Sequence, residues 1–443
     1  MAGIPLNPPT PGWSVVIRPR DWAKLSEHLF SGRGEHGAAL LAELTDGPRG
    51  RRLLVRKVIL ATEGKDYVPG TTGFKALTAE FVRDCVSRAH DAGLAYIPVH
   101  NHGGFERVQF SSVDLDSHER GYPTLVQFTG KPVMALVLTR AAAAGDVFLP
   151  DGTRDGLGEL VVPGSNLMRL RPAPAAHASR DGRWDRQARV YGDAGQDIFG
   201  AMRVAVVGLG GAGSLITEFI ARLGVGHVVL VDPQDVDETN LPRLVAAEVD
   251  DVGTPKVHVA ARNARRANPS IVVTELIREV HDPKVLTAIV DCDFIFLAAD
   301  SNSARHFVNQ VVEESLIPGI QVGVKVPADD DGVVGRIHVA VRPMIPGAGC
   351  LWCNQLIDAT ELAIDLQPQA VRDGARYVDE VPAPSVIALN ALAVSEAVNR
   401  FMMGMTGLLL DEDPSYTVAF PRERDTQIHA QRRDADCRFC GDR

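Results

Sequence analysis

The strongest constraint on the fold of this chain is the segment at residues 203–232, RVAVVGLGGAGSLITEFIARLGVGHVVLVD. Its order predicts a strand, a tight turn, a helix and a second strand that ends in Asp232. The turn holds four glycines, Gly208, Gly210, Gly211 and Gly213. A glycine turn before a helix lets a phosphate approach bare backbone, and an acid after the second strand can bond a ribose hydroxyl. The segment therefore predicts a nucleotide site in a doubly wound α/β domain, which fits an NAD oxidoreductase as well as an ATP enzyme.

The residues around this segment favour ATP. Downstream lie DPQDVDETNLPR from Asp232, GTPK at 253–256 and FLAADSNSAR at 296–305, and upstream lies RWDRQARVYGDAGQ at 183–196. Hydride transfer has no need of these motifs. Together they resemble the ThiF-like superfamily of ubiquitin-activating and sulfur-carrier-activating adenylating enzymes, over roughly residues 180–440.

This resemblance implies a reaction in which the C-terminal glycine carboxylate of a ubiquitin-like protein attacks the α-phosphorus of ATP. Because the step brings anions together, cations and a metal must neutralise the charge. By resemblance, Arg243 and Lys256 hold the phosphates, and Asn240 helps to position them. Asp300 binds Mg²⁺, and Asp232 takes the ribose. Arg186 matches an arginine that many relatives donate across a dimer interface, which implies a homodimer.

The cysteines predict a metal site of their own. Four of the six form two CxxC pairs, Cys350 with Cys353 and Cys437 with Cys440. Two such pairs far apart in sequence predict one structural zinc bound by four thiolates. Disulfides and free thiols are the weaker alternatives, because the sequence does not start with a secretory signal.

The remaining cysteines, Cys85 and Cys292, are predicted core residues. Activating enzymes that form a thioester carry a cysteine in the later part of the chain, yet residues 354–436 contain none. The resemblance therefore leaves open whether a thioester forms on this chain or the adenylate passes directly to a partner's cysteine or a sulfur donor.

A second group of polar residues lies in the N-terminal third. AYIPVHNHGG predicts a strand that ends in His100 and His102, which project from the same face. Ser111 and Asp114 are spaced to share one side of a helical turn, and Glu35 precedes a strand or helix of small, apolar residues. This pattern resembles the JAB or JAMM zinc isopeptidases. Two features depart from it: eight residues instead of seven separate His102 from Ser111, and Asn101 replaces a smaller residue.

The second resemblance implies a catalytic zinc bound by His100, His102 and Asp114, with Glu35 as general base and Ser111 as oxyanion donor. Two imidazoles and one carboxylate leave zinc an open position for water, and the base can later protonate the leaving amine. Paired histidines before a glycine turn can also be ordinary loop residues. The alternative is a non-catalytic binding module.

Length and composition predict two modules. With 443 residues, 45% of them hydrophobic, the chain can bury two cores. We predict a JAB/MPN-like mixed-sheet metalloprotease domain at 1–172 and a Rossmann-like adenylation domain at 173–443, joined near 170–185. The formal charge of −10 disfavours nucleic acid and anionic membranes as partners.

Several elements are also predicted. They are strands at 53–60, 95–99, 125–130 and 133–139, a helix at 75–92 and a strand pair within 328–343. Residues 391–410 are interrupted by Glu396 and Arg400, so we expect an amphipathic helix and no transmembrane span.

The two resemblances together imply a prokaryotic, cytoplasmic, bifunctional enzyme. One module would cut after a glycine and the other would activate that carboxylate, with ATP, Mg²⁺ and two Zn²⁺ ions, one catalytic and one structural. The expected partners are a ubiquitin-like protein and, for conjugation, a ubiquitin-conjugating-like enzyme. The alternative is sulfur-carrier activation in cofactor or cysteine biosynthesis, with the N-terminal domain trimming or only binding the carrier. Operons that pair the two activities are associated with phage defence.

Overall fold

A computed structural model describes residues 4–32, 34–69, 76–176, 182–329, 332–368, 371–372 and 384–441. The chain divides into two compact units, which we call the first and second unit. The first comprises 1–163 and 167–177, and the second comprises 164–166 and 178–443. The predicted boundary after residue 172 lies five residues before the observed one at 177. Part of the predicted linker, 177–181, lies outside the described residues.

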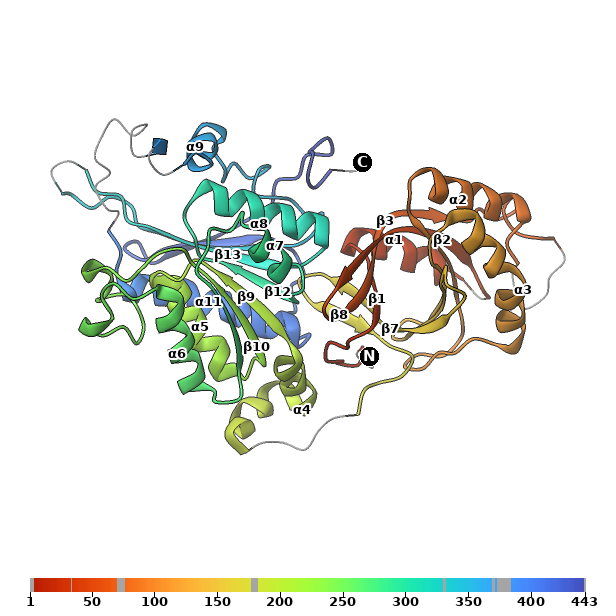
Figure 1. Cartoon of the computed structure of the whole chain (residues 1–443), viewed down its shortest axis with the longest axis horizontal. Coiled ribbons are helices and arrows are strands. Elements are labelled where there is room, and N and C mark those ends of the chain that lie inside the picture. The colour runs from red at the N-terminus through yellow and green to blue at the C-terminus, as the bar shows by residue number, and fades with distance from the viewer. Residues whose placement is uncertain are drawn as a thin grey trace. The chain divides into compact units, whose positions relative to one another are not determined.

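The described part of the first unit is built on an eight-stranded mixed sheet in the order β1-β3-β2-β4-β5-β6-β7-β8. A further pairing of β1 with β7 closes it (Figure 1). Pairs β1–β3, β1–β7 and β4–β5 are parallel, and the others are antiparallel. The elements are β1 (Trp13–Val16), α1 (Pro19–Leu29), β2 (Gly37–Gly47), β3 (Gly50–Leu60), α2 (Ala79–Asp91), β4 (Ala95–Asn101), α3 (Ser112–Thr129), β5 (Val133–Leu138), β6 (Ala143–Phe148), β7 (Arg154–Pro163) and β8 (Leu167–Leu170).

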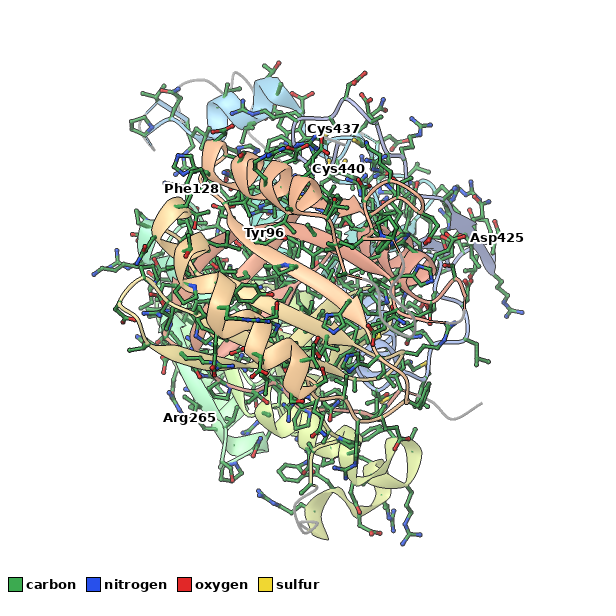
Figure 2. The ribbon with its side chains drawn as sticks, turned by 90° about the vertical axis from the view of Figure 1, so that its right-hand side faces the viewer. Tyr96, Phe128, Arg265, Asp425, Cys437 and Cys440 are labelled. Atoms are coloured by element: carbon green, nitrogen blue, oxygen red, sulfur yellow. The ribbon has the colours of Figure 1, made fainter. Side chains whose placement is uncertain are left out.

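The central strands of this unit are buried on both faces, because their side chains alternate between two apolar cores. On β4, Ile97 and Val99 lie in the core that includes residues of α1. Tyr96 lies in the core that includes residues of α2 and α3 (Figure 2). Even-numbered residues of β4 therefore face α2 and α3, and odd-numbered residues face α1. This alternation places His100 and Asn101 on opposite sides of the strand.

The second unit has a sheet in the order β11-β10-β9-β12-β13-β14-β15-β16 (Figure 1). The first five strands are parallel neighbours, and the last three add in antiparallel fashion. The elements are α4 (Asp185–Ala201), β9 (Arg203–Val207), α5 (Gly211–Leu223), β10 (His227–Val231), α6 (Lys256–Ala267), β11 (Val272–Leu276), α7 (Pro283–Ile289), β12 (Phe294–Leu297), α8 (Asn302–Ser315), β13 (Gly319–Lys325), β14 (His338–Met344), α9 (Ala359–Asp365), α11 (Ile387–Met405), β15 (Tyr416–Phe420) and β16 (Asp425–His429).

Helices cover the parallel part of this sheet in the manner of a doubly wound fold. Helices α7 and α8 share an apolar core with β9, β10 and β12, whereas α5 contacts α6 and α11. From β9 the chain runs to β10 and β11 on one side, then crosses to β12 on the other side of β9. Ligands of doubly wound folds bind at such a switch point, beyond the carboxyl ends of the strands. The switch point here lies between β9 and β12.

One predicted strand is wrong. Residues 125–129 belong to the C-terminal half of α3, because Leu125 and Val126 pack in the apolar core that also contains Tyr96 and residues of α2. A short apolar run does not distinguish a strand from a buried helix turn. Of the strand pair predicted within 328–343, β14 forms, whereas the described residues of the earlier half, 328–329 and 332–337, contribute an isolated bridge between Ala328 and Val334.

The helix predicted at 391–410 is confirmed as α11, which starts four residues earlier. Among the described residues, no helix is long and apolar enough to cross a membrane.

Candidate functional site

The glycine turn after β9 has the close approaches that only glycine permits. Gly208 has φ of +87°, and a Cβ on it would lie 2.6 Å from the backbone nitrogen of Ala299. A Cβ on Gly213 would lie 1.8 Å from the carbonyl oxygen of Gly208. The turn is therefore packed against the end of β12, and the N-terminus of α5 opens at the switch point.

Asp232 follows β10, and its carboxylate is buried. Its Oδ2 accepts a hydrogen bond from the Leu209 amide at 2.6 Å, and its Oδ1 accepts one from the Gln234 amide at 2.8 Å. Burial raises the pKa of this carboxyl group, although the two amide hydrogen bonds oppose the rise. Asp232 therefore organises the glycine turn in addition to any contact with a ribose.

The predicted phosphate-binding residues are connected to this turn, Arg243 directly, Lys256 through Gln234 and Asp232, and Asn240 through Arg243. Lys256, the first residue of α6, is 7% exposed and donates from Nζ to Gln234 Oε1 at 2.6 Å. Arg243 lies against the turn, because a Cβ on Gly211 would be 3.5 Å from the Arg243 Cβ. Asn240 is buried in the preceding 3₁₀ turn, where its Oδ1 accepts from the Asp237 amide.

Asp300 and Arg186 are the two remaining predicted residues of this site. Asp300 is exposed just after β12 and precedes Ser301, the N-cap of α8. It therefore shares the switch point with the glycine turn. Arg186 is exposed on α4, and the contacts of the described chain do not join it to the turn.

The four paired cysteines converge in the second unit, where Figure 2 labels Cys437 and Cys440 close together. Sγ–Sγ distances are 3.7 Å for Cys350–Cys353, 3.7 Å for Cys350–Cys437 and 3.5 Å for Cys353–Cys440. Four thiolates about 2.3 Å from one tetrahedral zinc are separated by roughly 3.8 Å. Burial raises the pKa of Cys437, but backbone hydrogen bonds from Cys440 and Phe439 bring it down to about 7. The donor set fits zinc.

A row of polar side chains on α8 holds the segment that carries the first cysteine pair. Residues of α8 bind backbone or side-chain groups within residues 347–358, through the contacts Glu313 Oε2 with the Gly347 amide, Asn309 Oδ1 with the Leu351 amide, His306 Nδ1 with Trp352 Nε1, Arg305 Nη1 with the Leu356 carbonyl and Asn302 Oδ1 with the Asp358 amide. The N-terminus of the same helix adjoins Asp300. The cysteine knuckle and the switch point are therefore linked by one helix.

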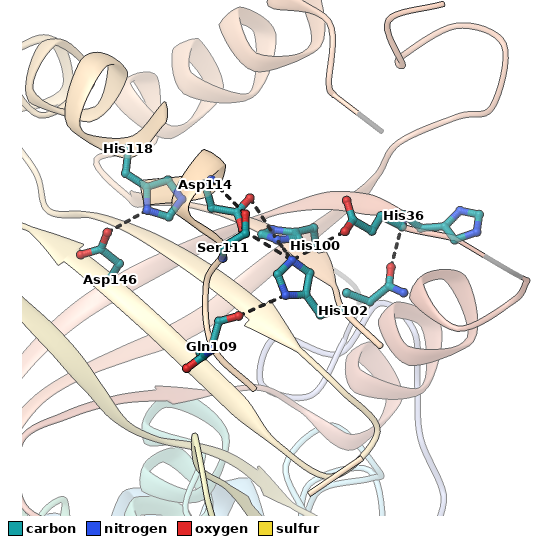
Figure 3. Close-up of polar contacts among 10 residues, drawn as sticks. His36, His100, His102, Gln109, Ser111, Asp114, His118 and Asp146 are labelled. Atoms are coloured by element: carbon teal, nitrogen blue, oxygen red, sulfur yellow. Dashed lines mark hydrogen bonds and ion pairs between the residues drawn. The ribbon is translucent and has the colours of Figure 1, made fainter. Parts of the chain in front are cut away.

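The histidine cluster forms in the first unit as the sequence predicts (Figure 3). His100 Nε2 lies 3.1 Å from His102 Nε2, and the two Nε2 atoms lie 3.6 and 3.5 Å from the carboxylate oxygens of Asp114. Ligands about 2.0–2.1 Å from a tetrahedral zinc are separated by roughly 3.4 Å. Two imidazoles and one carboxylate at these distances fit a three-ligand zinc site.

The surroundings orient the ligands of this cluster. The carbonyl oxygen of Gln109 lies 3.1 Å from His102 Nδ1, so a proton on Nδ1 leaves Nε2 free to bind a metal. Burial raises the pKa of Asp114, but hydrogen bonds from His100, His102 and Ser111 hold it well below its usual range. Asp114 is therefore a carboxylate at neutral pH.

Glu35 and Ser111 both lie next to the cluster of His100, His102 and Asp114. Glu35 Oε1 lies 3.7 Å from His102 Nε2, which places the carboxylate beside the ligand atoms. Ser111 is the N-cap of α3, and its hydroxyl donates to Asp114 Oδ2 at 2.7 Å. In this structure Ser111 orients the carboxylate of Asp114.

The comparisons with known proteins concern the second unit. The ThiF family profile matches residues 184–422. The chain belongs to the ThiF family. This match contains the glycine turn, Asp232, Lys256 and Asp300, but none of the histidine cluster. The prediction of a zinc isopeptidase in the first unit therefore depends on the residues and geometry described above alone.

Three curated relatives show how far the likeness to known proteins extends. The SAMP-activating enzyme E1 of Haloferax volcanii is 31% identical over 37% of this chain and 56% of its own. The tRNA threonylcarbamoyladenosine dehydratase of Escherichia coli is 40% identical over 21% and 34%. The sulfur carrier protein ThiS adenylyltransferase of E. coli is 28% identical over 34% and 58%. The chain therefore spans between about a third and just over half of the length of these relatives.

Sequence reasoning missed three residues of the two sites. Gln234 joins Asp232 and Lys256, and Gln109 contributes only its carbonyl oxygen. Asn101 was noted only as a departure from the isopeptidase pattern, yet its side chain binds both neighbours of Glu35. Contacts made through backbone groups leave no residue-type signal. The unusual Asn101 was the one available hint.

Proposed function

We propose that the second unit uses ATP to adenylate the C-terminal glycine of a ubiquitin-like or sulfur-carrier protein. The observation that carries this proposal is the glycine turn at the switch point of a ThiF-family sheet, with Arg243 packed against the turn and Lys256 joined to Asp232 through Gln234. The names of two relatives, the SAMP-activating enzyme and the ThiS adenylyltransferase, support this class of substrate.

The roles of the residues follow from charge and position. The amides at the start of α5 can bind phosphate oxygens, and Arg243 and Lys256 can neutralise the charge that builds up when a carboxylate attacks the α-phosphorus. The exposed carboxylate of Asp300 can bind the Mg²⁺ that accompanies the nucleotide. Asn240 would position the phosphates. Asp232 would bind the ribose while it holds the turn.

Pyrophosphate exchange into ATP tests this proposal. Wild-type chain with a ubiquitin-like carrier should catalyse exchange, and Asp300→Ala should abolish it by removing a metal ligand. Asp293→Ala, which removes a carboxylate at the opposite end of β12, is the matched control. Exchange by wild type without any carrier, or retained exchange in Asp300→Ala, would contradict the assignment.

A second activity is favoured by the histidine cluster, and we propose that the first unit is a zinc isopeptidase that acts on the same carrier. The spacing of His100, His102 and Asp114 fits three ligands of one zinc, with Glu35 beside them. A zinc ion bound there would supply the Lewis acid for hydrolysis of an amide. Glu35 would accept the proton of the attacking water and pass it to the leaving amine.

Cleavage assays with Glu35→Ala test this second proposal. The variant should retain the metal, because Glu35 is not one of the three ligands, and should lose cleavage of a peptide or protein attached to the C-terminal glycine of a carrier. Glu106→Ala, in the loop after β4, is the control. If Glu35→Ala loses zinc from the first unit, Glu35 is a ligand and the proposed roles are wrong.

The two activities would share one ligand. Release of a carrier at its C-terminal glycine yields the carboxylate that adenylation consumes. We propose that the chain acts as a homodimer through Arg186 and delivers the adenylate to a ubiquitin-conjugating-like enzyme or to a sulfur donor. Mass spectrometry of the carrier decides between these routes, because conjugation gives an amide and sulfur transfer gives a thiocarboxylate.

A further inference from the structure

The residue between the two histidines makes contacts that neither resemblance assigns. Asn101 ends β4 and is 7% exposed. Its Oδ1 accepts a hydrogen bond from the His36 amide at 2.7 Å, and its Nδ2 donates to the Gly34 carbonyl at 3.2 Å. These two partners are the residues on either side of Glu35. One buried amide therefore brackets the proposed general base.

The alternation of β4 explains why this residue is available. His100 projects toward α3 and the cluster, so Asn101 projects toward the other face of the sheet. Strand β2 begins at Gly37, which pairs with His100. The preceding residues, 34–36, have passed the end of the β2 ladder. Asn101 continues the pairing with its side chain where the strand has stopped.

The backbone adds one weaker bond to the same segment, from the Asn101 amide to the His36 carbonyl at 3.4 Å. The His36 ring points away from the cluster (Figure 3), while the Glu35 carboxylate lies 3.7 Å from His102. The orientation of this segment decides which of the two side chains faces the metal ligands. A rotation of the segment would exchange them.

We propose that Asn101 is a positioning residue that fixes the segment 34–36 so that Glu35 faces the cluster of His100, His102 and Asp114. The inference depends on the isopeptidase activity proposed for the first unit. Asn101 suits this task because an amide accepts and donates at once. An aspartate would keep only the acceptor, and an alanine would keep neither.

Hydrogen exchange tests whether Asn101 holds the segment 34–36 in place, without any catalytic assay. In Asn101→Ala, the His36 amide should exchange about 2- to 10-fold faster, which is the effect of losing one net hydrogen bond. In Asn101→Asp, the acceptor remains and His36 should stay protected. The matched control is Asn7→Ala, because Asn7 is a buried asparagine of the same unit whose side chain also binds backbone groups, the carbonyls of Pro5 and Arg169 and the amide of Ala175. Unchanged exchange in Asn101→Ala would overturn the proposal.

Kinetic measurements then test whether the contacts of Asn101 position Glu35 for catalysis. A panel of ubiquitin-like proteins with a coumarin amide on the C-terminal glycine serves as substrate. Asn101→Ala should lower kcat about 10- to 100-fold, as loss of outer-shell partners of metal sites does, with KM and zinc content unchanged. Asn7→Ala should keep the wild-type kcat. Full kcat in Asn101→Ala, in a chain whose exchange shows a released segment, would overturn the positioning role.

The two proposals fail in different ways. If wild type cleaves no member of the panel although zinc is bound, the isopeptidase proposal is wrong, and the exchange measurement still decides whether Asn101 holds the segment. If wild type cleaves and Glu35→Ala does not, the activity stands, and the kcat of Asn101→Ala alone decides the positioning role.

Discussion

The nucleotide site is formed mainly by backbone groups, whereas the histidine cluster is formed mainly by side chains. The nucleotide site is mainly a backbone conformation, a glycine turn contiguous in sequence between β9 and α5, to which Asp232 adds two hydrogen bonds. The histidine cluster is mainly side chains, which come from the end of β4, the start of α3 and the segment before β2. The first kind of site is specified locally, whereas the second needs three elements to meet.

The largest expected effect comes from adding one methyl group to the turn. Gly213→Ala would place a Cβ 1.8 Å from the Gly208 carbonyl, so the turn cannot keep its shape. We expect pyrophosphate exchange to disappear and cleavage by the first unit to persist. Gly200→Ala is the control, because a Cβ at that position meets open space. If Gly213→Ala retains exchange, the phosphate site does not depend on the backbone of this turn.

The converse change removes the side chains of the cluster. In His100→Ala with His102→Ala, zinc measured by atomic emission should fall from two ions per chain to one, and cleavage should be lost while exchange continues. His90→Ala, an exposed histidine of α2, should keep both ions. One zinc in both wild type and the double variant would mean that the first unit is a binding module.

The third prediction concerns the zinc of the cysteine knuckle, which is expected to stabilise the second unit without taking part in a reaction. Cys437→Ser should remove the zinc of the cysteine knuckle and lower Tm, because binding of structural zinc is coupled to folding. Each kcal/mol lost should lower Tm by about 2–4 °C for a unit of this size. Cys292→Ser, at a buried thiol outside the knuckle, should leave the zinc content unchanged. An unchanged zinc content in Cys437→Ser would contradict the four-thiolate site.

The smallest expected effect concerns the pH dependence of stability, through the contacts of Asp146 with His118 and Arg154 in the first unit. Burial raises the pKa of Asp146, but hydrogen bonds from His118 and Arg154 lower it below its usual range. A depressed pKa contributes stability above the unfolded value of about 3.9 and loses it as pH falls through the folded value. The free energy of unfolding should therefore decline below about pH 4, and less steeply in Asp146→Asn. Equal slopes in urea titrations would contradict the pairing.

The difference between a site that is local in sequence and one that joins three elements explains what could be predicted from the sequence. The turn at Gly208–Gly213, the strands on either side and the cysteine pairs are short-range patterns, and the structure bears them out. Spacing alone predicts that His100 and His102 share a face of the strand and that Ser111 and Asp114 share a side of a helical turn. The grouping of Asp114 with the histidines was implied by the resemblance to zinc isopeptidases.

What could not be predicted depended on tertiary context. Residues 125–129 are apolar enough for a strand, but they extend α3 because Leu125 and Val126 complete a face that α2 covers. The anchoring of Glu35 by Asn101 requires knowing where β2 begins relative to β4, a register that no local pattern fixes. The hydroxyl of Ser111 also serves as the N-cap of α3, a contact that the spacing alone does not indicate.

The alternation of β4 also limits how the first unit can tolerate change in chain length. Inserting one residue within the strand would turn the histidines toward α1 and Asn101 toward α3, so the histidines and Asn101 would exchange sides of the sheet. An insertion beyond His102 leaves the strand register untouched. The loop at 103–110 is where this chain has one residue more than the isopeptidase pattern that it resembles. Between β4 and Ser111, an added residue is therefore compatible with the site after His102 and not before it.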